Sequence, residues 1–166
     1  MTGRRIAGAA AVIAALGLAA WFLVGGGDET TIITARLNTL AGEINQSTVD
    51  GLGTAARAVQ LSTYFTEDIE IDLGQGTAPI RGRATVIGMA ERLQPRTAAF
   101  KLSFEDITVV LDPSAATATV HLTAEVTRRS ITTGEASLDA HEFSLAMRKV
   151  NGEWQIATAT AIKVLK

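Results

Sequence analysis

Few side chains in this chain have types and spacings suited to catalysis or metal binding. The 166 residues include two histidines and no cysteine, so thiolate nucleophiles and thiolate metal ligands are excluded. His141 alternates with Phe143, Leu145 and Met147, which predicts a strand face that is otherwise apolar. His121 instead alternates with apolar residues and belongs to a polar face. A histidine beside apolar side chains can shuttle protons, but it is more often a hydrogen-bonded core or rim residue.

Other patterns that resemble catalytic motifs are incomplete. His141-Glu142 resembles the start of a zinc peptidase motif, but no second histidine follows four residues later. Gly74 and Gly76 follow a predicted strand, yet the third glycine and the helix of a dinucleotide-binding loop are missing. Four arginines near the third predicted helix could bind an anion, but arginines are more often simply exposed to solvent. They are Arg81, Arg83, Arg92 and Arg96. These patterns predict neither a metal site nor a cofactor.

An uncharged apolar run occupies residues 6–24, between Arg4-Arg5 and Asp28-Glu29. As a helix the run would be roughly 28 Å long, about the thickness of the hydrocarbon core of a bilayer. The basic residues before it and the acidic residues after it predict that the N-terminus stays in the cytoplasm and the rest is exported. A cleaved signal peptide is the alternative, but its apolar region is usually shorter and ends in small residues. We therefore predict a single-pass anchor in the bacterial inner membrane, with a periplasmic C-terminal domain.

The rest of the chain has the size of one domain. Gly25–Gly27 predict a short flexible joint, so the anchor and joint occupy residues 1–27 and the domain occupies residues 28–166. The formal net charge of −2, without a long run of one sign, gives no indication of nucleic-acid binding. Because an exported domain without cysteine has no disulfides, packing alone must stabilise it.

Before Phe100 the apolar spacing predicts three helices and one short strand. The first helix is the clearest, because Ile33, Leu37 and Leu40 recur on one face. Thr54 is expected to cap the second helix. The expected bounds are 30–46, 54–64 and 86–93 for the helices, the last stopped by Pro95, and 69–74 for the strand. The expected inner face of the second helix consists of Ala55, Ala58, Val59 and Ser62.

From Phe100 onward the period of the apolar residues changes to two, which predicts a four-stranded antiparallel meander. Asn151-Gly152 predicts a tight type I′ hairpin, because both central residues of that turn need a positive φ. The strands are longer than usual, so the sheet must be strongly twisted or bent, with one face against the helices. The other two turns are expected at Asp112-Pro113-Ser114 and Thr133-Gly134.

This order of elements resembles the nuclear transport factor 2-like fold, also called the SnoaL-like or cystatin-like cone. The resemblance covers residues 30–165 and implies an α+β cone, with three helices packed on a strongly bent antiparallel sheet. Ketosteroid isomerases, polyketide cyclases, scytalone dehydratases and non-enzymatic binding domains all resemble one another at this level. The stretches that carry the resemblance are residues 64–72, Ile80-Arg81-Gly82-Arg83, Val86-Ile87-Gly88-Met89, Phe143–Met147 and Asn151-Gly152-Glu153-Trp154-Gln155-Ile156.

Catalytic members of this superfamily place carboxylates and a tyrosine in a conical pocket, where an apolar wall raises a carboxyl pKa. The resemblance implies Asp72 as a general base and Tyr64 as a hydrogen-bond donor, with Asp139 or His141 facing them. The structural alternative is that Asp72 caps a loop and Tyr64 packs at a helix end. The expected ligand-pocket residues are Phe65, Met89, Phe104, Phe143, Met147 and Trp154.

Two classes of function are compatible with these features. The favoured one is a membrane-tethered, envelope-facing domain that binds a small apolar ligand or a partner protein without catalysis. The alternative is an isomerase, cyclase or dehydratase that acts on a small hydrophobic substrate through Asp72, Tyr64 and His141. A homodimer is also expected, because small residues on the outer sheet face could bury against a second copy. These residues are Ser144, Ala146, Ala157, Ala159 and Ala161.

Overall fold

The fold is α+β, with helices packed on a single bent sheet. The computed structural model describes residues 29–46, 51–74, 76–92, 98–130 and 132–162. A helix over residues 29–45 precedes the labelled elements. These are α2 (Gly51–Ser62), β1 (Phe65–Asp72), β2 (Ile80–Arg81), α3 (Arg83–Arg92), β3 (Ala98–Leu111), β4 (Thr117–Ser130), β5 (Ala136–Val150) and β6 (Glu153–Ala161).

The predicted membrane anchor, residues 6–24, lies outside the described residues. Within the described ranges, the helices are too short or too polar to cross a bilayer.

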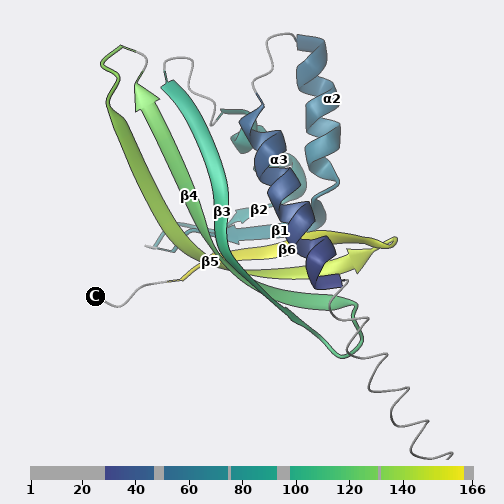
Figure 1. Cartoon of the computed structure of the whole chain (residues 1–166). Coiled ribbons are helices and arrows are strands. Elements are labelled where there is room, and N and C mark those ends of the chain that lie inside the picture. Colours follow the sequence, from purple (N-terminus) through teal and green to yellow (C-terminus); the bar gives the residue numbers. More distant parts are fainter. Residues whose placement is uncertain (1–28, 47–50, 75, 93–97, 131, 163–166) are drawn as a thin grey trace, which may run out of the picture.

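The sheet has six strands in the order β2-β1-β6-β5-β4-β3. Strands β3 to β6 form the predicted antiparallel meander, whereas β1 pairs in parallel with β6. The halves of β3, β4 and β5 far from β6 rise as an arm, defined here as residues 98–105, 123–130 and 136–142 (Figure 1). A β-bulge between Glu105 and Thr108, where Asp106 has a φ of 52°, marks the bend. The bent sheet predicted from the long strands is thus confirmed.

The first helix lies across the concave face of the sheet (Figure 1). Its residues Ile33, Leu37 and Leu40 are at most 2% exposed, as their spacing predicted. They share one hydrophobic core with Ile69 of β1 and Trp154 of β6. At the other end of this helix, the side chain of Asn45 bonds both the N–H and the C=O of Leu102 at 2.7 Å each, which fastens the helix to the edge strand β3.

The second helix differs from its predicted form. It begins at Gly51, so Thr54 lies inside it and is not its cap. Its predicted inner face is also wrong, because Ala55 is exposed and Val59 is 70% exposed, whereas Leu61 is buried. Val59 and Leu61 are two residues apart, which is about 200° around a helix. An alanine-rich segment has too few large apolar residues to fix which side faces the core.

Several observed bounds of helices and strands differ from the predicted ones by a few residues. Strand β1 starts at Phe65, before the predicted Ile69, and the two-residue strand β2 was not predicted. Helix α3 starts at Arg83, and its predicted stop at Pro95 lies outside the described residues. The type I′ turn is confirmed by positive φ values at Asn151 (52°) and Gly152 (86°).

The outer face of the sheet was also misassigned at two positions, because Ala161, like Ala159, lies on the concave face, where it pairs with Phe143. Ala159 is only 9% exposed and belongs to the core, so it cannot contribute to an outer dimer surface. A register shift in the β5–β6 pairing, between Ala146 and Met147, reverses the alternation expected along β6. Ser144 and Ala146 lie on the outer face as predicted, because they pair with the exposed Thr160 and Thr158.

Candidate functional site

Tyr64 lies where α2 leads into β1 and is 7% exposed. Its carbonyl oxygen accepts a hydrogen bond from the N–H of Ile156 at 2.8 Å, and the guanidinium of Arg36 lies 4.8 Å from its ring centroid. Burial raises the pKa of the Tyr64 hydroxyl, and the charge of Glu43 raises it further. The residue is therefore a packed, protonated phenol at the end of a helix.

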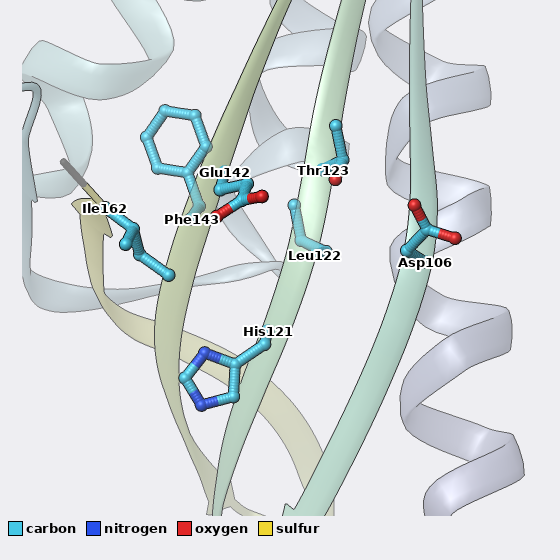
Figure 2. A pocket seen from close by; sticks show the side chains of 7 residues that line it. All are labelled: Asp106, His121, Leu122, Thr123, Glu142, Phe143 and Ile162. Atoms are coloured by element: carbon cyan, nitrogen blue, oxygen red, sulfur yellow. The ribbon is translucent and has the colours of Figure 1, made fainter. Parts of the chain in front are cut away.

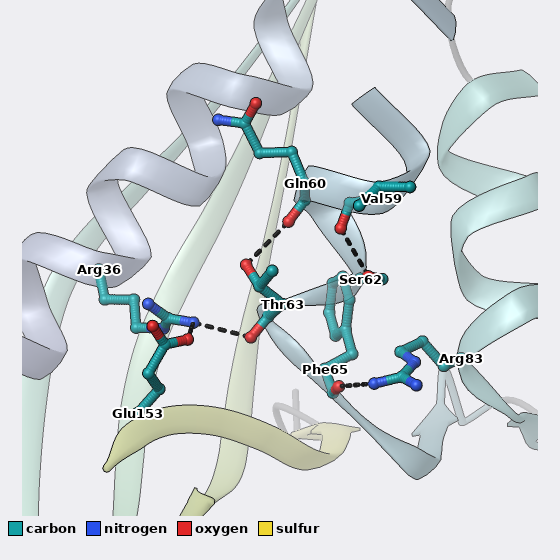
Figure 3. A network of polar contacts seen from close by, with 8 residues as sticks. All are labelled: Arg36, Val59, Gln60, Ser62, Thr63, Phe65, Arg83 and Glu153. Atoms are coloured by element: carbon teal, nitrogen blue, oxygen red, sulfur yellow. Dashed lines mark hydrogen bonds and ion pairs between the residues drawn. The ribbon is translucent and has the colours of Figure 1, made fainter. Parts of the chain in front are cut away.

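Arg36 connects the first helix to Thr63 and to Glu153 of β6 (Figure 3), and its guanidinium lies over the Tyr64 ring. Its Nη2 donates to the carbonyl oxygen of Thr63 at 2.7 Å and to the Glu153 carboxylate at 3.1 Å. On the other side of Phe65, Arg83 donates to the carbonyl oxygen of that residue at 3.4 Å. Because both arginines donate hydrogen bonds to backbone carbonyl oxygens, the polar groups around Tyr64 have a structural role.

Asp72 lies at the end of β1 on the face that points away from the core. It pairs with the exposed Thr160, whereas its neighbour Ile71 pairs with the buried Ala159. One carboxylate oxygen of Asp72 accepts a hydrogen bond from the N–H of Gly74 at 2.8 Å, which forms a turn at the strand end. At about 3.3 Å per residue, roughly 26 Å of strand separates Asp72 from Tyr64.

His141 lies on the arm, in a row that crosses three strands. It pairs with Ala124, which in turn pairs with Phe104, so these side chains share the concave face. His141 is exposed, whereas Met147 farther along the same face is 2% exposed. Asp139, the other predicted partner, forms an ion pair with Arg128 at 3.2 Å. The structure therefore does not bring Asp72, Tyr64 and His141 together.

The predicted ligand-pocket residues divide into three groups. Phe65, Met147 and Trp154 are at most 7% exposed and are core residues. Met89 is 39% exposed on α3. Phe104 and Phe143 are half-buried and pack against the edge of the core. Together with other half-buried residues of the concave face they form a surface that we call the apolar wall: Leu102, Phe104, Ala124, Val126 and Phe143.

Arg57 carries a buried charge that was not predicted from the sequence. It is 7% exposed, its Nη2 donates to the carbonyl oxygen of Ile44 at 2.7 Å, and its Nε has no partner. Ile44 belongs to the last turn of the first helix, where the helix dipole favours a cation. Arg57 thus lies close to the Asn45 contact, at the end of the first helix that meets the arm.

A second concentration of titratable side chains lies on the convex face, at the bend (Figure 2). A pocket of about 200 Å³ there is lined by Asp106, His121 and Glu142 from three neighbouring strands and by Ile162. It also borders Leu122 and Phe143, which pair with each other and belong to the opposite, concave face. Among the described residues, no group of three potential ligands could hold a metal ion. A larger pocket of about 530 Å³, on the same face near the β3–β4 turn, is lined mainly by small or apolar residues such as Val110 and Ala146.

The bent six-stranded sheet, with helices across its concave face, defines a nuclear transport factor 2-like cone. The chain belongs to the SnoaL-like domain family, whose model matches residues 52–160. No curated protein matches the chain.

Solved structures show the same fold at low sequence identity. A protein from Novosphingobium aromaticivorans provisionally named as a scytalone dehydratase has a TM-score of 0.67 and 14% identity, covering 84% of this chain and 87% of the other. A provisionally named dehydratase of the nuclear transport factor 2-like family from Streptomyces avermitilis has a TM-score of 0.64 and 12% identity, covering 84% and 99%. A nuclear transport factor 2-like protein from N. aromaticivorans has a TM-score of 0.61 and 18% identity, covering 87% and 86%.

Proposed function

We propose that this protein is a membrane-tethered SnoaL-like domain that binds a small apolar ligand or an apolar segment of a partner protein on its concave face, without catalysis. The observation that carries the proposal is the contrast between two sets of residues. The apolar wall is half-buried and extends over β3 and β4, with Phe143 of β5 at its border, whereas Asp72 and Tyr64 lie about 26 Å apart along a strand, and Asp72 faces away from the core. Residues 6–24 supply the tether, which places the domain on the outer side of the inner membrane.

A fluorescent apolar probe, N-phenyl-1-naphthylamine, tests the binding site. Phe104→Ser and Phe143→Ser each remove a half-buried ring from the wall. Completing the burial of such a ring contributes about half of the roughly 1.5–3 kcal/mol for full burial, so we expect about four- to tenfold weaker binding. Leu138→Ser is the matched control, because Leu138 is 61% exposed and pairs with Thr127 on the convex face, away from the proposed dimer surface. Equal affinity in all three variants would place the binding site elsewhere.

The second candidate function is an isomerase, cyclase or dehydratase. It is supported by His141, an exposed imidazole on the concave face in line with Phe104, and by the names of the structural neighbours. If this function holds, His141→Ala must abolish conversion of a hydrophobic substrate. Asp72→Asn must do the same if Asp72 is the base, in spite of its outward direction. Native mass spectrometry of the protein purified from its host identifies the retained molecule, and a chemically altered one would favour the enzyme.

A homodimer through the convex face is part of the same proposal. The pocket near the β3–β4 turn joins Val110 and Ala146 into a shallow apolar surface that a second copy can cover. Sedimentation of the protein in detergent should give a dimer that Ala146→Glu converts to a monomer. A wild-type monomer at all concentrations would remove this part of the proposal.

A further inference from the structure

Glu29, the first described residue, is held by two side chains of the β5–β6 hairpin. Its Oε1 accepts a hydrogen bond from Nζ of Lys149 at 2.5 Å, and its Oε2 accepts one from Nε1 of Trp154 at 2.6 Å. The Lys149 ammonium also lies 5.5 Å from the Trp154 ring centroid, and Trp154 is 1% exposed. Only residues 25–28 separate this cluster from the end of the predicted anchor.

The cluster also marks one end of the domain. The N–H of Lys149 bonds the carbonyl oxygen of Ala116 at 2.8 Å, so the β3–β4 turn lies beside the β5–β6 turn. Figure 1 shows the start of the first helix next to this hairpin end, with the β4–β5 turn at the far end of the arm. Along β5, about 43 Å of strand separates Lys149 from Ala136.

The apolar wall lies toward the opposite end from Glu29. Leu102 of the wall contacts Asn45, which is sixteen residues after Glu29 in the sequence. At 1.5 Å per residue, the first helix therefore separates Glu29 from this contact by about 24 Å.

We infer that the cluster of Glu29, Lys149 and Trp154 fixes the point at which the tether leaves the domain, and so keeps the β5–β6 hairpin end of the domain at the membrane. The β3–β4 and β5–β6 turns face the lipid headgroups, and the arm with its apolar wall points away from the bilayer. Residues 25–28 span at most about 14 Å, so the two turns stay close to the headgroups. The ligand or partner of the wall consequently arrives from the aqueous compartment. This inference rests on the membrane tether of the proposed function.

The charges near the cluster show why lipid charge does not set this orientation. Lys149 is paired with Glu29, and Arg36 is paired with Glu153. Among the residues that the structure describes around the cluster, these pairs leave no excess of positive charge that anionic headgroups could attract. The orientation should therefore be the same on phosphatidylcholine vesicles and on vesicles that contain phosphatidylglycerol.

Single-cysteine labelling of the full chain tests the orientation, because the protein contains no native cysteine. Ser114→Cys and Thr133→Cys place bimane in the exposed β3–β4 and β4–β5 turns. The protein is floated with vesicles that carry nitroxide-labelled headgroups. We expect bimane at position 114 to be quenched at least twofold more than at position 133, on both lipid compositions. Failure to float would overturn the tether and the orientation together, whereas flotation with equal or reversed quenching would overturn the orientation alone.

A second pair of variants tests the role of the cluster. Glu29→Ala should remove the difference between the two labels, because both side-chain hydrogen bonds to the hairpin are lost. Glu153→Gln is the matched control, since it changes another acidic residue beside Trp154 and should preserve the difference. Circular dichroism should show that both variants are folded, because Glu29 is partly exposed in the first turn of a helix and Glu153 is 57% exposed at the start of β6. An undiminished difference in Glu29→Ala would overturn the role of the cluster.

Discussion

Replacing Glu29 by Gln should destabilise the domain by about 1 kcal/mol at neutral pH. The amide keeps an acceptor for the indole of Trp154 but loses the charge that pairs with Lys149. A hydrogen bond between charged groups contributes about 1.5–3 kcal/mol. The side chains of Glu29 and Lys149 are 22% and 30% exposed, so solvent screening reduces that figure.

The difference in stability between the wild type and Glu29→Gln should disappear at acidic pH. The hydrogen bond from Lys149, and then the one from Trp154, hold the pKa of Glu29 below its usual value of 4.5. A carboxyl group with a depressed folded-state pKa contributes stability above its unfolded-state pKa, and this contribution is lost as the pH falls through the folded-state pKa. The wild type and Glu29→Gln should therefore differ at pH 7 and converge as the pH falls below 4.5 and through the lowered pKa of Glu29.

Urea unfolding in a non-ionic detergent measures this difference. The chain has two tryptophans, Trp21 and Trp154, so a Trp21→Phe background leaves Trp154 as the only indole reporter beside the cluster. Glu153→Gln serves as the control, because the Glu153 side chain is 57% exposed and its pair with Arg36 should contribute less than about 1 kcal/mol. Equal stability of the wild type and Glu29→Gln at pH 7, or a difference that persists in acid, would refute this reasoning.

Three further predictions concern the core, the strand end and the hairpin. Leu37→Ala should cost about 3 kcal/mol in urea unfolding because Leu37 is 1% exposed, whereas Ile32→Ala, at a position 45% exposed, should cost less than about 1 kcal/mol. Asp72→Asn should leave both the stability and the apolar-probe affinity within about twofold of wild type, since the amide oxygen can still accept from Gly74; a large loss of affinity would assign Asp72 to the binding site. Gly152→Ala should cost about 1 kcal/mol, measured by thermal unfolding, because its φ is 86°; an unchanged melting temperature would contradict the assigned turn.

The features predicted correctly from the sequence are those set by local spacing. The face of the first helix follows from three apolar residues within two turns, and the last hairpin follows from Asn151-Gly152. The meander follows from a period of two that continues after Phe100. In each case the residues that determine the structure are neighbours in the chain.

The candidate site could not be predicted in the same way, because it depends on pairings between distant segments. The direction of the Asp72 side chain is set by the register between β1 and β6, which are far apart in the chain. The burial of Arg57 depends on where α2 meets the end of the first helix. The resemblance supplied the residue types of a catalytic site, but the observed register and bend place them on different faces.

The paired hydrogen bonds between Asn45 and Leu102 have a consequence for self-association. The amide side chain presents a donor and an acceptor to the border of β3, as the backbone of an adjoining strand would. A β-strand of another molecule therefore cannot pair with this part of the edge strand β3. Such protection of edge strands is a common way to prevent aggregation. The Asn45 side chain thus helps to keep the edge strand β3 from pairing with other molecules and aggregating.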